Sequence, residues 1–439
     1  MVNTLFLPEL REMLLENNQA ELEEFCIALN AGRTAEFMEG LSDSEAWQVL
    51  QHAAPERRVE IFSYISPVSQ TAMLQEQDVS EVATLVEALA EDDRVDLLQE
   101  LTDQRVAKIL PLLPVEERRN IQRLGSYAEG TAGSLMTTEV AKLEERLTVQ
   151  QALDELRRRS SELETIYYLY VVDDDDILRG IVSARQLVSA LSRPERTLGD
   201  MMETDVVAAK NDEDQESVAE KVERYNLLAI PVVDDGHRLL GVITHDDVID
   251  VVREELTEDV QRIAAVAPLE QGFLEIGLLK LSWKRGLWLT ILFIAALLTA
   301  FALRHYDAEL ETYGWLVWFI PLIISAGGNS GSQSATLVIT AMTSGEVRQG
   351  DYATIIRREL LVSLLLGGFL AAIGFIVACF AAPSIHAAWV LPITLLSVIL
   401  CGCLCGAILP LFFKRLGLDP AMMSNPFVAG IVDILGIVI

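Results

Sequence analysis

Basic residues are scarce in this chain relative to acidic ones. Its 439 residues include 34 Lys and Arg against 65 Asp and Glu, so the formal net charge is −31 at pH 7. A protein of this charge repels the phosphates of nucleic acids, and we therefore expect no nucleic-acid partner. Divalent cations such as Mg²⁺ bind carboxylate oxygens and are the natural counter-ions of such a surface.

Cysteines are also few, and their positions exclude a disulfide framework. Three of the five form a Cys-x-Cys-x-Cys run at 401–405, inside an apolar stretch. Residues two apart lie about 200° apart around a helix, so these thiols do not share one ligand face. Together with Gly402 and Gly406, we interpret the run as small residues that allow close helix packing.

Motifs of enzymes and of secreted proteins are both absent from the sequence. We find no nucleophile–base pattern, no Walker loop and no metal-hydrolase spacing, and the five histidines are scattered singly. The first 30 residues carry several acids and lack the basic start and apolar stretch of a signal peptide. We therefore predict a protein that is not an enzyme and whose N-terminal part stays in the cytoplasm.

The charge that is present divides the chain into two parts. From Lys284 onward there are eight acidic and eight basic residues, so the whole excess of negative charge falls on the first 283 residues. This asymmetry predicts an acidic soluble half followed by a neutral, apolar membrane half.

Residues 1–132 have the pattern of short amphipathic helices separated by prolines. Two stretches resemble each other: LSDSEAWQVLQHAAPERRVEIFSYI and LAEDDRVDLLQELTDQRVAKILPLL. Each combines an acidic helix start with an apolar stripe. We predict an acidic, all-α N-terminal domain whose helices stack into a superhelix.

An internal duplication follows. The stretch IYYLYVVDDDDILRGIVSARQLVSAL recurs about sixty residues later as LLAIPVVDDGHRLLGVITHDDVIDVV, and the segments before the two copies also match. Each copy predicts a β-α-β-β-α unit, and two such units pack as one pseudo-symmetric module. The pattern resembles a pair of CBS domains. We place the first α/β CBS unit at 133–197 and the second at 198–256.

A connecting helix is predicted over 257–279, with Pro268 as a kink or break. Five apolar stretches then follow, at 286–303, 315–341, 360–382, 389–413 and 427–439. The first four are long enough to span a membrane, and we expect the chain to be truncated inside a fifth helix. The fold class is therefore multidomain, and it ends in an all-α transmembrane pore domain of five helices at 280–439.

Basic residues at the ends of these stretches predict their orientation. Pairs of basic residues flank the first, third and fourth stretches, at 284–285, 357–358 and 414–415, whereas the intervening loops have few. The positive-inside rule then places the N-terminus in the cytoplasm and the C-terminus outside the cell (inner) membrane.

The second apolar stretch has a polar middle, GGNSGSQS at 327–334. Two interpretations stay open. The glycines and serines could serve close helix packing, or they could line or support a pore. The second is favoured because Asn329 and Gln333 lie one helical turn apart.

Asp433 is the single acidic residue in the last apolar stretch. A carboxylate within a membrane is costly, and it indicates a functional site. Asn425, Ala429 and Asp433 recur every four residues, close to one helix face. Mg²⁺ keeps several waters and needs only one or two carboxylates, so this set suits a hydrated ion. The alternative is an aspartate near the outer surface.

Acidic residues gather in the soluble half, at EDDRVD (91–96) and along HDDVIDVVREELTED (245–259). Like charges this close destabilise a helix unless they are neutralised. We predict regulatory divalent-cation sites, with an ordinary solvated face as the alternative. The candidates are Asp92, Asp93, Asp96, Asp247, Asp250, Glu254, Glu255, Glu258 and Asp259.

The CBS resemblance also implies a nucleotide. Adenosine ligands of CBS pairs use a Gly-h-h-Ser/Thr-x-x-Asp element, where h is apolar, and Gly241, Thr244 and Asp247 match it. The first copy has Gln186 where the aspartate is expected. At most one site for ATP, as a regulatory ligand, is therefore intact.

The three parts in this order resemble the MgtE family of magnesium transporters over essentially the whole chain. The stretches GGNSGSQSATLVITAMTSGEV and DPAMMSNPFVAGIVD carry the resemblance most specifically. It implies a homodimer in the bilayer with a pore between the subunits, ion recognition by Asp433, and a connecting helix that acts as a plug. Cytoplasmic Mg²⁺ would bind the acidic domains and close the pore.

Two other functions remain open. A CBS-regulated transporter of another divalent cation, such as Co²⁺ or Mn²⁺, would use the same residues. A carrier of anions or organic solutes is disfavoured by a pore aspartate without a Lys or Arg inside the membrane.

Overall fold

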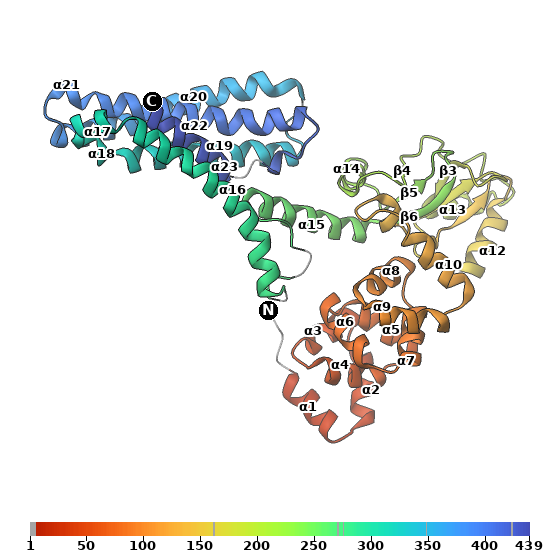
Figure 1. Cartoon of the computed structure of the whole chain (residues 1–439). Helices are drawn as coiled ribbons and strands as arrows, with labels where there is room; N and C mark the ends of the chain where they lie inside the picture. The colour runs from red at the N-terminus through yellow and green to blue at the C-terminus, as the bar shows by residue number, and fades with distance from the viewer. Residues whose placement is uncertain (1–5, 161–162, 270–271, 275, 348, 423–424) are drawn as a thin grey trace. The chain divides into compact units, whose positions relative to one another are not determined.

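The computed structural model describes residues 6–160, 163–269, 272–274, 276–347, 349–422 and 425–439. Within these ranges the chain forms two compact units, one up to Val252 and one from Arg253 onward. Figure 1 shows both units, and each is described below by itself.

The first unit opens with a stack of short helices, as the sequence predicts. Side-chain caps and prolines define their starts: Asn18, Asn30 and Ser42 each accept a hydrogen bond from a first-turn N–H, and Pro55 and Pro67 occupy first positions. The helices are α1 Leu7–Leu15, α2 Gln19–Ala28, α3 Ala31–Met38, α4 Asp43–Gln51, α5 Pro55–Ser63, α6 Pro67–Glu76, α7 Val79–Glu87, α8 Glu91–Glu100, α9 Asp103–Ile109, the 3₁₀ turn η1 Leu110–Leu112 and α10 Val115–Leu124.

Two arginines at equivalent places hold this stack together. Arg57 donates to the carbonyls of Cys26 and Leu29 at the end of α2, and Arg105 donates to Leu74 and Gln77 at the end of α6. Both pairs have the same sequence separations, 31 and 28 residues. Arginine thus satisfies carbonyls that a helix end leaves without partners. The arrangement confirms the stacked-helix repeat that the two similar stretches predict.

The duplicated α/β units have matching topologies. The first contains β1 Lys142–Glu144, α12 Val149–Arg159, β2 Tyr168–Val172, β3 Leu178–Ser183, α13 Ala184–Ser189 and the turn η2 Ala190–Ser192. The second contains β4 Ala209–Lys210, α14 Gln215–Tyr225, β5 Ala229–Val233, β6 Leu239–Thr244 and α15 His245–Ile263. In each, the first two strands pair in parallel, the last two are antiparallel, and the register shifts at a Val-Val pair, 171–172 or 232–233.

A short helix that precedes the first α/β unit packs against the second α/β unit. In α11 (Ala132–Leu135), the N–H groups of Ala132 and Gly133 donate to the carbonyls of Glu213 and Asn211. Met136 is fully buried in the core of the second α/β unit. The segment after the helical stack therefore ties the pair of units together.

The connecting segment differs from the prediction. We expected one connecting helix over 257–279 with a kink or break at Pro268. Instead α15 begins at His245 and ends at Ile263, before the proline, and α16 begins only at Leu278. Ala265 takes a left-handed conformation (φ 58°) directly after α15, and Pro268 follows. An L-residue in that conformation cannot continue a right-handed helix, so the chain leaves the helix five residues before the proline.

The second unit is built from apolar helices. They are α16 Leu278–His305, α17 Asp307–Thr312, α18 Gly314–Val317, α19 Ile320–Thr343, α20 Tyr352–Ala381, α21 Ile385–Ala388, α22 Val390–Arg415 and α23 Asn425–Val438, with 3₁₀ turns η3 Gln349–Asp351 and η4 Pro420–Met422. Three described segments, Leu278–His305, Tyr352–Ala381 and Ile385–Arg415, are long and apolar enough to cross a membrane, and α23 is shorter. The α19 helix has 24 residues, but its middle is polar.

The α22 helix lies at the centre of this bundle and packs against α19, α20 and α23 (Figure 1). Its contact with α19 is made through glycines on both helices. A Cβ on Gly402 would lie 2.5 Å from the carbonyl oxygen of Gly327, and one on Gly406 would overlap that of Gly331. Small residues thus let the two backbones touch, as membrane helices require for close association. This packing confirms our interpretation of the glycines beside the cysteine run.

Candidate functional site

The glycines and Ser334 in the polar middle of α19 confirm close packing with α22, whereas the pore-lining interpretation stays a prediction. Gly327, Gly331 and Ser334 are buried toward α22, whereas Asn329 and Gln333 are exposed. Asn329 donates to the hydroxyl of Ser325 one turn earlier, at 3.3 Å. The exposed residues therefore form a polar row on the helix face that points away from α22.

The start of α23 is fixed to α19 by hydrogen bonds. The amide of Asn425 donates to the Thr336 hydroxyl at 3.0 Å. The Asn425 carbonyl accepts from Ser332 at 3.2 Å, so one of its two lone pairs is already engaged. These bonds fix the first turn of α23 and aim its next turns along α19.

Asp433 lies two turns further along α23, beside a glycine of α19. A Cβ on Gly328 would lie 3.8 Å from Oδ1 of Asp433 and 3.6 Å from the Cβ of Ala429. The packing side of α23 is formed by Val428 and Val432, which are fully buried, whereas Asn425, Ala429 and Asp433 are half-buried. Asn425, Ala429 and Asp433 are thus partly accessible on α23, and their role in binding a hydrated cation stays a prediction.

Carboxylates from α8 and α15 meet in the first unit. Burial raises the pKa of Asp92 well above its usual range, and the like charges of Asp247 and Asp93 add to this effect. Loss of solvent also raises the pKa of Asp93, helped by the charges of Asp246 and Asp250. Among the described residues, Oδ1 of Asp92 is buried and has no hydrogen-bond partner. The fold thus brings together acidic groups that repel one another, which favours a bound cation.

Glu164 belongs to the same group, although sequence reasoning missed it. Loss of solvent, followed by the charges of Asp247 and Asp246, raises the pKa of this side chain. It lies between α12 and β2, far in sequence from both acidic runs, so no local pattern marks it. In contrast, Glu91 is buried and accepts hydrogen bonds from Asn120 (2.6 Å) and the Thr138 N–H (2.8 Å), which gives it a structural role.

A second acidic group lies at the end of α15, in the second unit. Burial raises the pKa of Asp259 to about 6, with contributions from the charges of Asp419 and Glu255. Arg262 forms ion pairs with both Glu258 and Asp419. Asp419 precedes η4 and was not singled out from the sequence, because one aspartate before a proline has the pattern of an ordinary turn.

Two predicted residues lie elsewhere on the same helices: Asp96 on α8 and Glu254 on α15 are both exposed. Across the described ranges, no three Asp, Glu, His or Cys side chains come close enough together to hold a metal ion by themselves. Mg²⁺ typically retains several waters and uses one or two carboxylates, so pairs of carboxylates remain chemically suitable.

The candidate nucleotide residues surround the start of α15. Asp247 accepts hydrogen bonds from the backbone N–H (3.2 Å) and the hydroxyl (2.5 Å) of Thr244. Gln186 makes the same two bonds with Ser183 in the first copy, at 2.7 and 2.9 Å. This element therefore caps a helix in both copies, and the carboxylate of Asp247 distinguishes the second.

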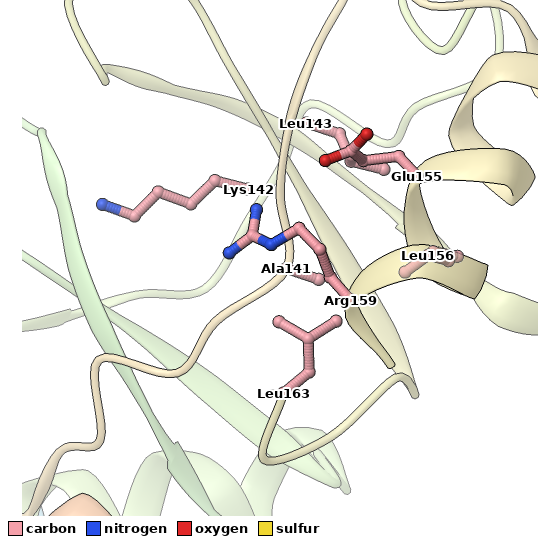
Figure 2. Close-up of a pocket in the computed structure, with 7 residues that line it drawn as sticks. All are labelled: Ala141, Lys142, Leu143, Glu155, Leu156, Arg159 and Leu163. Carbon is pink, nitrogen blue, oxygen red and sulfur yellow. The ribbon is translucent and has the colours of Figure 1, made fainter. Parts of the chain in front are cut away.

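Two pockets lie in the first α/β unit. Figure 2 shows one beside α12, where Glu155 and Arg159 extend near Lys142 of β1. It encloses about 170 Å³ of empty space, which is too small for a nucleotide. The other pocket has about 940 Å³ of empty space, open to solvent, and its lining includes Arg185, Arg193 and Arg196. Three arginines in an acidic protein form a suitable site for an anion.

Comparison with known proteins covers both units. Residues 320–439 match the MgtE family, described as divalent cation transporters; residues 29–130 match the MgtE intracellular N domain, and residues 132–193 and 198–254 match CBS domains. The magnesium transporter MgtE of Thermus thermophilus is 33% identical over 435 residues, which cover 98% of this chain and 96% of that protein.

Two solved structures resemble the soluble part. The soluble part of a magnesium transporter is 32% identical with a TM-score of 0.53, and covers 56% of this chain and 97% of its own. The cytosolic domain of the Mg²⁺ channel MgtE in complex with ATP is 33% identical with a TM-score of 0.52, and covers 55% of this chain and 98% of its own. Given the near full-length similarity to the Thermus protein, this chain belongs to the MgtE family of divalent cation transporters.

Proposed function

We propose that this protein is a magnesium-selective channel that admits Mg²⁺ and closes when Mg²⁺ binds its cytoplasmic domains. The observation that carries the proposal is the placement of Asp433 on α23, half-buried beside Gly328 of α19. A carboxylate at that place attracts a divalent cation while the ion keeps its inner waters. The names of the relatives, which are magnesium transporters, favour Mg²⁺ over Co²⁺ or Mn²⁺.

A pore between two copies of the chain follows from the same geometry. Asn329, Gln333 and the half-buried face of α23 are polar surfaces of apolar helices, and such surfaces avoid lipid. Facing them toward the same surfaces of a second copy would enclose a hydrated path, with one Asp433 from each subunit. We therefore infer a homodimer embedded in the bilayer.

The regulatory sites are the two acidic groups. One combines Asp92 and Asp93 with Asp247 and Asp250, and the other surrounds Asp259 with Glu255 and Glu258. Repulsion between carboxylates opposes the compact arrangement of each group until a cation neutralises it. Because Mg²⁺ binds the compact form better, it shifts the protein toward that form, which we assign to the closed state.

We propose ATP as a second regulatory ligand. Support comes from the solved relative in complex with ATP. Two separate places are candidates: Asp247, hydrogen-bonded to Thr244 in the second copy, and the arginine-lined pocket beside Gln186 in the first copy. We expect the detergent-solubilised chain to bind ATP in isothermal titration, and Arg185→Ala to weaken binding about tenfold, because it removes a charge-assisted bond. Arg146→Ala, an exposed arginine outside the pocket, is the control. Unchanged affinity of Arg185→Ala would exclude the pocket.

We infer that the N-terminus and the start of α20 lie in the cytoplasm and that the C-terminus lies outside. Arg357 and Arg358, near the start of α20, are exposed and support this orientation. We expect Arg357→Cys to react with a membrane-impermeant thiol reagent only after cells are opened. Asp307→Cys, at the start of α17 just after α16, should react in intact cells. Reversed labelling of the two variants would mean that the orientation is inverted.

A further inference from the structure

A second acidic side chain of the apolar helices, that of Glu359, forms a hydrogen bond where α19, α20 and α22 meet. Glu359 lies in α20, two turns from its start at Tyr352, and forms a short hydrogen bond with the hydroxyl of Ser334 in α19. The same hydroxyl lies 3.1 Å from the carbonyl oxygen of Cys403 in α22. Ser334 is only 3% exposed, so this contact is formed inside the protein.

The bond between Glu359 and Ser334 joins α20 directly to α19, two helices that each pack against α22. The α22 helix packs against both α19 and α20, and Val338 and Met342 of α19 share an apolar cluster with Tyr352 of α20. Apolar contacts are non-directional, and close glycine packing permits a helix to slide or rotate. A carboxylate–hydroxyl bond is directional and strong in a dry environment, so it fixes the rotation of α19 as packing alone does not.

The rotation of α19 decides where its polar row points. Gln333 is the residue before Ser334, so their side chains lie about 100° apart around the helix. Asn329 lies one turn before Gln333 on the same face. The face of α19 toward α23 is fixed separately by the bonds of Ser332 and Thr336 to Asn425. Loss of the Ser334 bonds would leave α19 held mainly on that side, and we expect the row that we assign to the ion path to turn.

We propose that Glu359 is a positioning residue, which acts through Ser334 to hold Asn329 and Gln333 toward the path of the ion. The inference rests on the proposed channel function, because Asn329 and Gln333 would line the ion path of that channel. Glu359 itself is directed at the interior of the bundle through this bond, and it need not touch the ion.

The test uses four variants of the full-length chain in proteoliposomes. Ser334→Ala and Glu359→Ala remove the bond from either side. Glu359→Gln keeps a side chain of the same length that can accept from and donate to the hydroxyl. Ser363→Ala removes another buried hydroxyl, which bonds only within α20 in the described contacts, and is the control for general packing damage.

The first readout is the reaction of a reporter thiol, Asn329→Cys, with a water-soluble thiol reagent, corrected for the native cysteines. We expect Ser334→Ala and Glu359→Ala to change its rate about tenfold, and Glu359→Gln and Ser363→Ala to leave it within about threefold. The second readout is the half-saturating Mg²⁺ concentration for uptake without the reporter, which should change in the same two variants. If Glu359→Ala does not fold, Ser334→Ala carries the test alone.

Wild-type rates in both Ser334→Ala and Glu359→Ala would overturn the proposal. A rate in Glu359→Gln as altered as in Glu359→Ala would overturn it as well, because the amide retains the bond. The thiol readout requires no transported ion. Absence of Mg²⁺ uptake by the wild type would therefore count against the proposed function and leave the positioning role to be judged by labelling.

Discussion

Replacing Asp433 with Ala should reduce Mg²⁺ uptake into proteoliposomes by about 10- to 150-fold, while the protein still inserts and folds. The range corresponds to the loss of one interaction with a charged group, about 1.5–3 kcal/mol. Asp433 is half-buried on the accessible face of α23, and its packing neighbours Val428 and Val432 are separate residues. Removing the carboxylate should therefore affect ion binding more than helix packing.

Two matched variants sharpen this experiment. Asp433→Asn keeps the size and removes the charge, so it should lose most of the flux if the charge attracts the ion. Asp307→Ala removes an exposed acidic residue at the start of α17 and should behave like the wild type. The measurement is the initial rate of a fluorescent Mg²⁺-uptake trace at equal protein content. Uptake by Asp433→Ala at the wild-type rate would remove Asp433 from the ion path.

Cytoplasmic Mg²⁺ should close the wild-type channel in the millimolar range, and a triple variant of the first acidic group should need at least about fivefold more. Asp92→Asn, Asp93→Asn and Asp247→Asn remove three carboxylates that meet between α8 and α15. Coupling between a regulatory site and a functional site is typically about 1–3 kcal/mol, and the lower value corresponds to this shift. Asparagine at 247 can still accept from Thr244, so the helix cap is kept.

When Mg²⁺ is absent, the soluble half of the same triple variant should be more compact than that of the wild type. The carboxylates that remain in its acidic group repel one another less, so in chelator its soluble half should resist protease better than that of the wild type. Added Mg²⁺ should protect the wild type strongly and the variant weakly. A solvated acidic face would produce neither effect.

The control places two substitutions in the turn between β2 and β3, outside both acidic groups. Asp174→Asn and Asp175→Asn change exposed residues of this turn and reduce the net negative charge by two. We expect them to leave both the midpoint of closure and the protease pattern unchanged. Channel recordings across a titration from chelator to excess Mg²⁺, beside proteolysis in the same buffers, measure both quantities. An open probability and a fragment pattern that stay flat in the wild type would refute regulation by these sites.

Local sequence patterns determined the elements of this protein, because the relevant signals are carried by neighbouring residues. The duplicated β-α-β-β-α pattern, the apolar stretches and the face of Asn425, Ala429 and Asp433 all follow from periodicity and charge. Each of these is a property of one segment. The structure confirms the duplicated units and the apolar helices, and it places Asn425, Ala429 and Asp433 on one helix, where their role stays a prediction. The end of α15 was misjudged because the left-handed turn at Ala265 has no local signal before Pro268.

Tertiary structure decided which distant residues meet. Glu164 joins the acidic group of α8 and α15, Asp419 pairs with Arg262, and Glu359 reaches Ser334 across the bundle. The sequence placed Glu359 outside the third apolar stretch, beside two arginines, where a carboxylate needs no explanation. Its partner is 25 residues away on another helix, and only the packing of α19 and α20 on α22 brings the two side chains together. Charge and periodicity act along a segment, whereas the partner of a buried carboxylate is set by how whole helices pack.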